Sequence, residues 1–108
     1  MRREAAHFLD SIAYERGLSQ HTRLAYERDL SAFFLFLEEQ GVGDFRQVTR
    51  GHIAAFLQHE KRQGRAVATR ARRLVAIKVF FRYLVAEGHL QQDVTAAITS
   101  GRHGRTLP

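Results

Sequence analysis

The stretch from Lys61 to Ala86 carries the densest charge in this sequence of 108 residues. It contains eight Lys or Arg residues and no Asp or Glu. Because the whole chain has a net charge of +6, the residues outside this stretch sum to −2, so the basic charge is local. A local concentration of Lys and Arg is typical of a surface that binds a polyanion such as nucleic acid. A solvated basic face without a partner is the alternative.

The same stretch has the apolar periodicity of a helix. Four apolar residues recur in it at spacings of three and four: Leu74, Ile77, Phe81 and Leu84. This spacing places them on one face of a helix that we expect from about Ala66 to Glu87. We expect Arg72, Ala76 and Val79 on the opposite face. Arg72 is then the best candidate to point into a nucleic-acid groove.

The other basic residues of this helix allow two interpretations. Arg70, Arg73 and Lys78 would reach either phosphates or buried acids. In the second case, Arg70 or Arg73 would pair across the bundle with one of the acids of the second helix, Glu27 or Asp29. An outer face that contains Val75 and Val79 indicates either a further helix that covers it or contact with base methyl groups.

Other chemistries find little support. The six His residues provide one pair at helical spacing, His52 and His59, with no matched third ligand, and Cys is absent, so we predict no metal site. Neither a Ser-His-Asp arrangement nor a glycine-rich phosphate loop is indicated. We therefore predict no catalytic residues, no cofactor and no enzymatic activity for this chain alone.

The elements that would position the basic helix are also predicted to be helices. We expect helices over about Arg3–Arg16, from an N-cap at Ser19 to Gly41, and from an N-cap at Thr49 to Arg62. A short fifth helix should follow Asp93, from Val94 to Ile98. The predicted fold class is all-α, a compact bundle of four main helices plus a short C-terminal helix. Residues 1–100 would form this domain and 101–108 a linker.

Composition agrees with one globular domain. Hydrophobic residues make up 44% and charged residues 26% of the chain, and no window approaches the roughly 18 apolar residues of a membrane span. The first residues lack the apolar run of a signal peptide. We therefore expect a soluble cytoplasmic protein that does not contact a membrane.

Two motifs resemble those of the Xer-type tyrosine recombinases and phage-type integrases. The first comprises Ser19 to Thr22, Ala25 to Leu30, Phe33 and Phe36-Leu37, and is similar to the family signature LS..T..AY..DL..F..FL. The second comprises Ala71 to Lys78 and Phe80 to Leu84, and is similar to RRLSALR.FY.YL. Thr49 to Leu57 looks like the family's third helix, so the resemblance covers about residues 6 to 108.

The resemblance implies a core-binding domain with a SAM-like fold, which forms half of a clamp around a recombination site. Its second and fourth helices would meet double-stranded DNA. The positions that match the family's DNA contacts, together with the neighbouring basic residues, are Thr22, Arg23, Arg28, Thr69, Arg70, Arg72, Arg73 and Lys78. The catalytic domain, with its nucleophilic Tyr, would be a separate C-terminal part. Tyr14, Tyr26 and Tyr83 are predicted on core stripes and are not expected to be that nucleophile.

The leading hypothesis is therefore sequence-directed binding of duplex DNA by the core-binding domain of a site-specific recombinase or integrase. The resemblance implies roles in DNA recombination and integration, which include chromosome dimer resolution, and partner protomers in a synaptic tetramer. The alternative is a basic helical protein-interaction module without DNA binding. The resemblance also shows departures: Val75 stands where the family usually has Ser, and Ala66 replaces a usual capping Ser.

Overall fold

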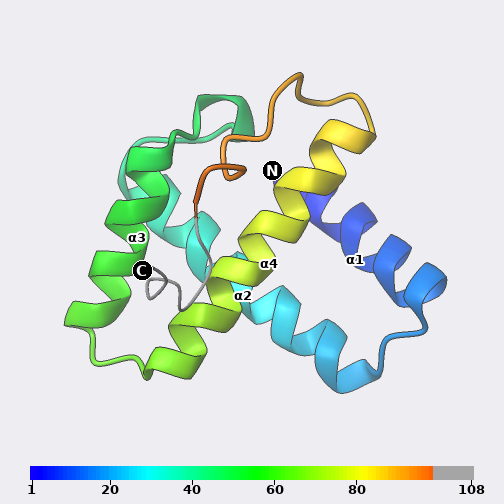
Figure 1. Cartoon of the computed structure of the whole chain (residues 1–108), viewed down its shortest axis with the longest axis horizontal. Helices are drawn as coiled ribbons and strands as arrows, with labels where there is room; N and C mark the ends of the chain where they lie inside the picture. The colour runs from blue at the N-terminus through cyan, green and yellow to red at the C-terminus, as the bar shows by residue number, and fades with distance from the viewer. Residues whose placement is uncertain (99–108) are drawn as a thin grey trace, which may run out of the picture.

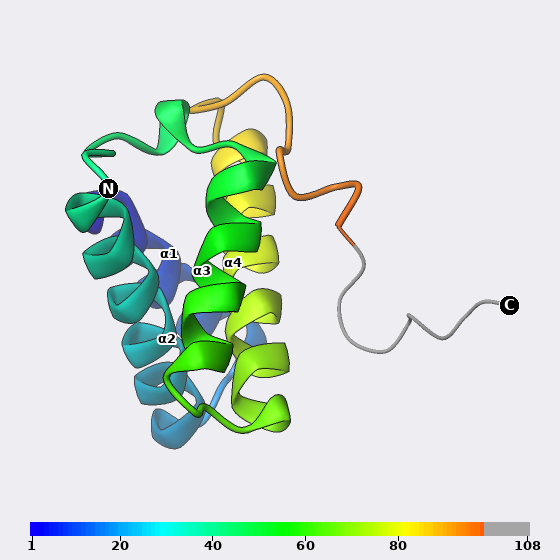
Figure 2. The ribbon, with the colours of Figure 1, turned by 90° about the vertical axis from the view of Figure 1, so that its left-hand side faces the viewer.

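The chain folds as a bundle of α-helices in a computed structural model that describes residues 1–98. Within these residues the helices are α1 (Arg2–Arg16), α2 (Gln20–Glu39), α3 (Arg50–Arg62) and α4 (Val67–Ala86), with a single 3-10 turn, η1 (Phe45–Gln47), between α2 and α3. Helix α4 crosses over α2 and also packs against α1 and α3 (Figure 1). Helices α3 and α4 lie side by side as a hairpin (Figure 2). The predicted all-α fold is confirmed.

Side-chain caps start two of the helices where the sequence predicted them. The Ser19 hydroxyl accepts a hydrogen bond from the Thr22 amide at 3.1 Å, and the Thr49 hydroxyl accepts one from the His52 amide at 3.2 Å. The His52 ring nitrogen accepts in turn from the Thr49 amide at 3.0 Å, which completes a capping box. These bonds pair amides that have no partner within the helix.

Helix α4 begins without such a cap. Ala66 has the extended backbone of an N-cap residue, with φ −64° and ψ 152°, but its methyl group cannot accept a hydrogen bond. A hydroxyl at this position would reach the first-turn amides, so Ala66→Ser should raise the free energy of unfolding by about 0.5–1 kcal/mol. Urea denaturation measures the change, with Ser19→Ala as the matched loss of a cap. An Ala66→Ser protein less stable than the parent would contradict the assignment.

The core is built largely from phenylalanine rings. Six of them are fully buried: Phe8, Phe33, Phe34, Phe56, Phe80 and Phe81. Phe80 lies among rings from two other helices, with centroid distances of 5.5 Å to Phe8 of α1 and 5.7 Å to Phe34 of α2. Aromatic rings at this separation and tilt interact favourably beyond their simple burial. Phe80 therefore links α4 to α1 and to α2.

The predicted burial of Ala76 and that of Tyr14 were both wrong. Ala76 was expected on the outer face of α4 but is fully buried, because α4 packs against all three other helices and its buried arc is wider than the four-residue stripe. Tyr14 was expected on a core stripe but is 90% exposed. Helix α1 buries one narrow face, formed by Ala5, Phe8, Leu9 and Ile12, and Tyr14 lies outside it.

The segment after α4 forms hydrogen-bonded turns where a short helix was predicted. The Asp93 carboxylate accepts from the Thr95 amide at 2.8 Å, and the Ile98 amide donates to the Thr95 carbonyl at 2.9 Å. These bonds close successive turns without a continuous helical ladder. The predicted boundary between residues 100 and 101 lies outside the described residues. Within residues 1–98 no helix is both long enough and apolar enough to cross a lipid bilayer.

Candidate nucleic-acid interface

The exposed face of α4 is narrow. It consists of small residues with cationic side chains beside them. Val75 is 38% exposed near its centre, one turn beyond Ala71. Arg72 and Arg82 are exposed along the same face, whereas Val79 is half-buried against the core. Because small side chains keep this part of the helix surface low, another molecule could approach its backbone closely. The predicted positions of Arg72 and Val75 on the outer side are confirmed, whereas the same prediction for Val79 was wrong.

Arg72 is held by a buried carboxylate. Its Nε donates to Asp29 Oδ2 at 2.9 Å and its Nη2 to Asp29 Oδ1 at 2.7 Å, so the two groups form a bidentate fork. The Asp29 side chain is fully buried, while that of Arg72 is 45% exposed. The hydrogen bonds from Arg72 to Asp29 raise the pKa of the Arg72 guanidinium above its usual value. Arg72 therefore stays charged and keeps one edge toward solvent.

Arg73 points into the bundle. Its Nε lies 3.3 Å from Asp29 Oδ1 on α2, and its Nη1 lies 2.5 Å from Glu60 Oε1 on α3. Glu60 is buried as well, and Arg65 approaches it from the turn before α4, at 3.7 Å. Pairing of Arg73 with Asp29, one of the two alternatives, is confirmed, and it joins three helices. We call the five residues Asp29, Glu60, Arg65, Arg72 and Arg73 the ion-pair network.

Glu60 was missed by the sequence prediction, although a signal was present. It follows Ile53 and Phe56 at the same helical spacing, so an acid occupies a position on the buried stripe of α3. A carboxylate at such a position requires a cationic partner, because an isolated buried charge is very unfavourable. The basic run of α4 provided the available partners.

Lys78 contacts the segment that follows α4. Its Nζ donates to the Thr95 carbonyl at 3.3 Å and to the Ile98 carbonyl. Carbonyl oxygens, rather than the phosphates or acids that were considered for Lys78, are its partners in this structure. Lys78 thus fixes residues 95–98 against the edge of α4.

The predicted contacts at the start of α2 divide into two groups. Arg23 donates to Asp10 at 2.7 Å and to the Leu9 carbonyl at 3.3 Å, so it holds α2 against α1. The Thr22 hydroxyl lies 3.0 Å from the Ser19 hydroxyl in the N-cap. Arg28 is exposed and forms no ion pair within residues 1–98. The guanidinium of Arg28 is therefore more accessible to a ligand than that of Arg23.

Thr69 and Arg70 lie in the first turns of α4. Arg70 does not pair with an acid within the described part of the chain; its Nε donates to the Arg65 carbonyl at 3.2 Å. Thr69 is half-buried. The first turn of α4 contains no acid. Unpaired amides of an uncapped helix start, with arginines beside them, favour an anion.

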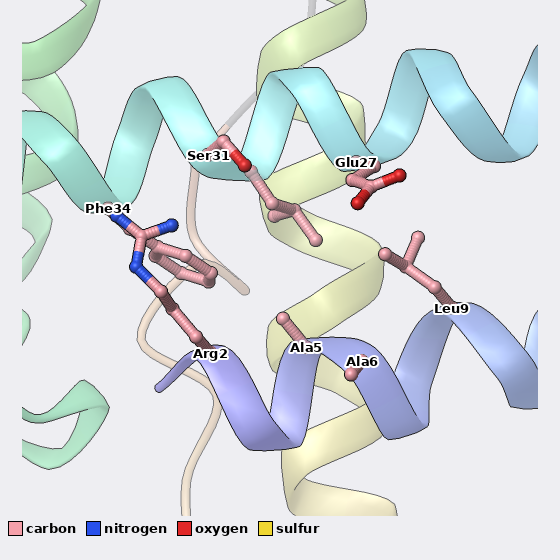
Figure 3. Close-up of a pocket in the computed structure, with 8 residues that line it drawn as sticks. Arg2, Ala5, Ala6, Leu9, Glu27, Ser31 and Phe34 are labelled. Carbon is pink, nitrogen blue, oxygen red and sulfur yellow. The ribbon is translucent and has the colours of Figure 1, made fainter.

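Hollows among the described residues have volumes of about 180 to 370 Å³. The one between α1 and α2 has a volume of about 180 Å³ and is lined by Ala5, Leu9, Glu27 and Phe34, with Arg2 beside the Phe34 ring (Figure 3). This volume is below the roughly 300–1,000 Å³ of typical small-molecule sites. Within residues 1–98 no three His, Cys, Asp or Glu side chains are grouped as metal ligands would be.

Comparison with known proteins defines the class of this bundle. A solved lambda integrase dimer bound to a COC′ core site has a similar fold, with a TM-score of 0.73 and 23% sequence identity, over 94% of this chain and 28% of that one. Residues 5–88 match the family described as phage integrase, N-terminal SAM-like domain. The chain therefore belongs to this family, and the resemblance drawn from its two motifs is confirmed.

Its relatives are tyrosine recombinases. XerC of Herpetosiphon aurantiacus is 36% identical over 108 residues, which are 100% of this chain and 35% of that protein. XerD of Rhizobium meliloti is 35% identical over 101 residues, or 94% of this chain and 32% of that protein. The chain thus spans about a third of the length of the curated relatives that it matches. What it matches is an integrase-type N-terminal domain of tyrosine recombinases.

Proposed function

We propose that this domain binds duplex DNA as the core-binding part of a site-specific tyrosine recombinase, and that it positions the DNA without cutting it. The observation that carries the proposal is the exposed face of α4. Small residues there are bordered by Arg72 and Arg82, and the whole stretch from Lys61 to Ala86 lacks an acid. A helix with a low, cationic surface fits the width of a major groove.

We expect the middle of α2 to extend this surface. Asp29 of α2 forms an ion pair with Arg72 of α4, so the two helices meet next to the exposed face. Arg28, the preceding residue of α2, is exposed and would reach a flanking phosphate. The solved lambda integrase with a similar fold is bound to a core site, which supports a DNA role for this fold. Further protomers of a recombinase would then be partners on the same DNA.

The sequence preference of the domain would arise on α4. Arg72 carries donors for a base edge or a phosphate, and Val75 offers an apolar contact for a thymine methyl group. As part of a recombinase, the domain would serve DNA recombination, such as chromosome dimer resolution or phage integration.

A protein-interaction module is the competing function, because an acidic protein could also bind the basic surface. Fluorescence anisotropy with a labelled short duplex of mixed sequence, and separately with labelled polyglutamate, distinguishes the two at physiological ionic strength. We expect tighter binding of the duplex. Tighter binding of polyglutamate would favour the interaction module and contradict DNA binding as the primary function.

A further inference from the structure

We propose that Asp29 is a positioning residue for DNA binding, which fixes the guanidinium of Arg72 so that its outer edge faces the DNA, while Arg73 serves only the fold. This inference rests on the proposed function, and it assigns opposite roles to two adjacent arginines. Arg72 points outward and Arg73 points inward, and both donate to the carboxylate of Asp29.

The bonds of the network leave Arg72 with donors to spare. Asp29 engages Nε and Nη2 of Arg72, at 2.9 Å and 2.7 Å. A guanidinium has five N–H donors, so both hydrogens of Nη1 and one of Nη2 remain. The Arg72 side chain is 45% exposed, and Asp29 holds it from the buried side. The edge of Arg72 away from Asp29 therefore remains available to a phosphate or a base.

Arg73 has no comparable edge. Its side chain is 13% exposed, and its donors engage Asp29 and Glu60. Its bonds join α4 to Asp29 of α2 and to Glu60 of α3, which is a role in the fold. Asp29 accepts from both arginines, but Arg72 is the one whose side chain reaches solvent.

Such a fixed side chain favours binding. An unrestrained exposed arginine loses rotamer freedom when it binds a phosphate, and that loss weakens the complex. In this domain the fork with Asp29 restricts Arg72 before DNA arrives. The negative charge of Asp29 acts in the opposite direction, since it lowers the net charge of the surface. The two effects must be separated by experiment.

Glu60 provides the matched control. Asp29→Asn and Glu60→Gln each remove one negative charge from the ion-pair network, but only Asp29 contacts Arg72. With a labelled short duplex of mixed sequence, we expect Asp29→Asn to bind about three- to tenfold more weakly than Glu60→Gln. In an Arg72→Ala background the two substitutions should give equal affinities, because the group that Asp29 positions is gone. Equal affinities in the parent background would overturn the proposal.

Arg72→Lys tests the same idea without touching a buried residue. Lysine keeps the charge but cannot form the two-pronged fork. We expect Arg72→Lys to lose nearly as much affinity as Arg72→Ala, and a Lys variant that binds like the parent would overturn the positioning role. Each variant is measured at a temperature at which circular dichroism shows it folded. If the parent itself fails to bind duplex DNA, the proposed function fails, and that outcome is distinct from equal binding by the variants.

Discussion

Replacing Phe80 with alanine is expected to lower the free energy of unfolding by about 3–5 kcal/mol. Phe80 is fully buried, and its ring lies against Phe8, Phe34 and Phe81, so the truncation leaves a cavity where α1, α2 and α4 meet. Domains of this size have a total stability of only about 5–15 kcal/mol. Chemical denaturation followed by circular dichroism measures the loss.

Tyr14→Ala is the matched control, since Tyr14 is 90% exposed on α1. Its removal should change stability by less than about 0.5 kcal/mol. Unfolding of the Phe80 and Tyr14 variants at the same denaturant concentration would contradict the buried position of Phe80.

The second large effect is expected for Arg73→Ala, at about 3–5 kcal/mol of lost stability. The substitution removes the cation between two buried carboxylates, and within residues 1–98 Glu60 then keeps one cationic partner, Arg65 at 3.7 Å. An uncompensated buried charge is strongly destabilising, and water can replace the missing partner only if the local structure opens.

Arg82→Ala provides the comparison for Arg73→Ala on the same helix. Arg82 is exposed and forms no ion pair in the part of the chain that the structure describes, so its loss should be nearly neutral. Thermal melts of the two variants give the difference directly. Similar melting temperatures would show that Arg73 does not hold the bundle together.

The helices themselves could be predicted from the sequence because local signals agree with the fold. Ser19 and Thr49 cap the helices that they were expected to cap, and Gly17 adopts the left-handed conformation, with φ 61°, that ends α1. The prediction of a short helix after Asp93 was wrong. Its backbone is fixed by Lys78, which is distant in sequence, and local propensity contains no information about that contact.

The basic helix could be predicted from the sequence, but the directions of its arginines could not. A basic helix at 61–86 was visible in the charge pattern, yet Arg72 and Arg73 look alike in the sequence. Their different directions follow from where Asp29 and Glu60 lie on neighbouring helices, which is a property of packing. Ala76 was misplaced for a related reason, since the width of the buried arc of α4 depends on how many helices surround it.

The ion-pair network thus joins stability to the surface that would bind DNA. Asp29 lies at this junction, because it accepts from the inward Arg73 and from the outward Arg72. Buried ion pairs often add little net stability compared with apolar packing. Their presence here is explained if the fixed direction of Arg72 matters for binding.

The most direct test of DNA binding is the affinity of the domain for a short duplex over a range of salt concentrations. Phosphates that are neutralised by Lys and Arg release condensed counterions, so the logarithm of the binding constant should fall linearly with the logarithm of the salt concentration. For about four neutralised phosphates we predict a slope of roughly −3 to −4. A binding constant that does not change with salt, or no binding at low salt, would contradict the proposal.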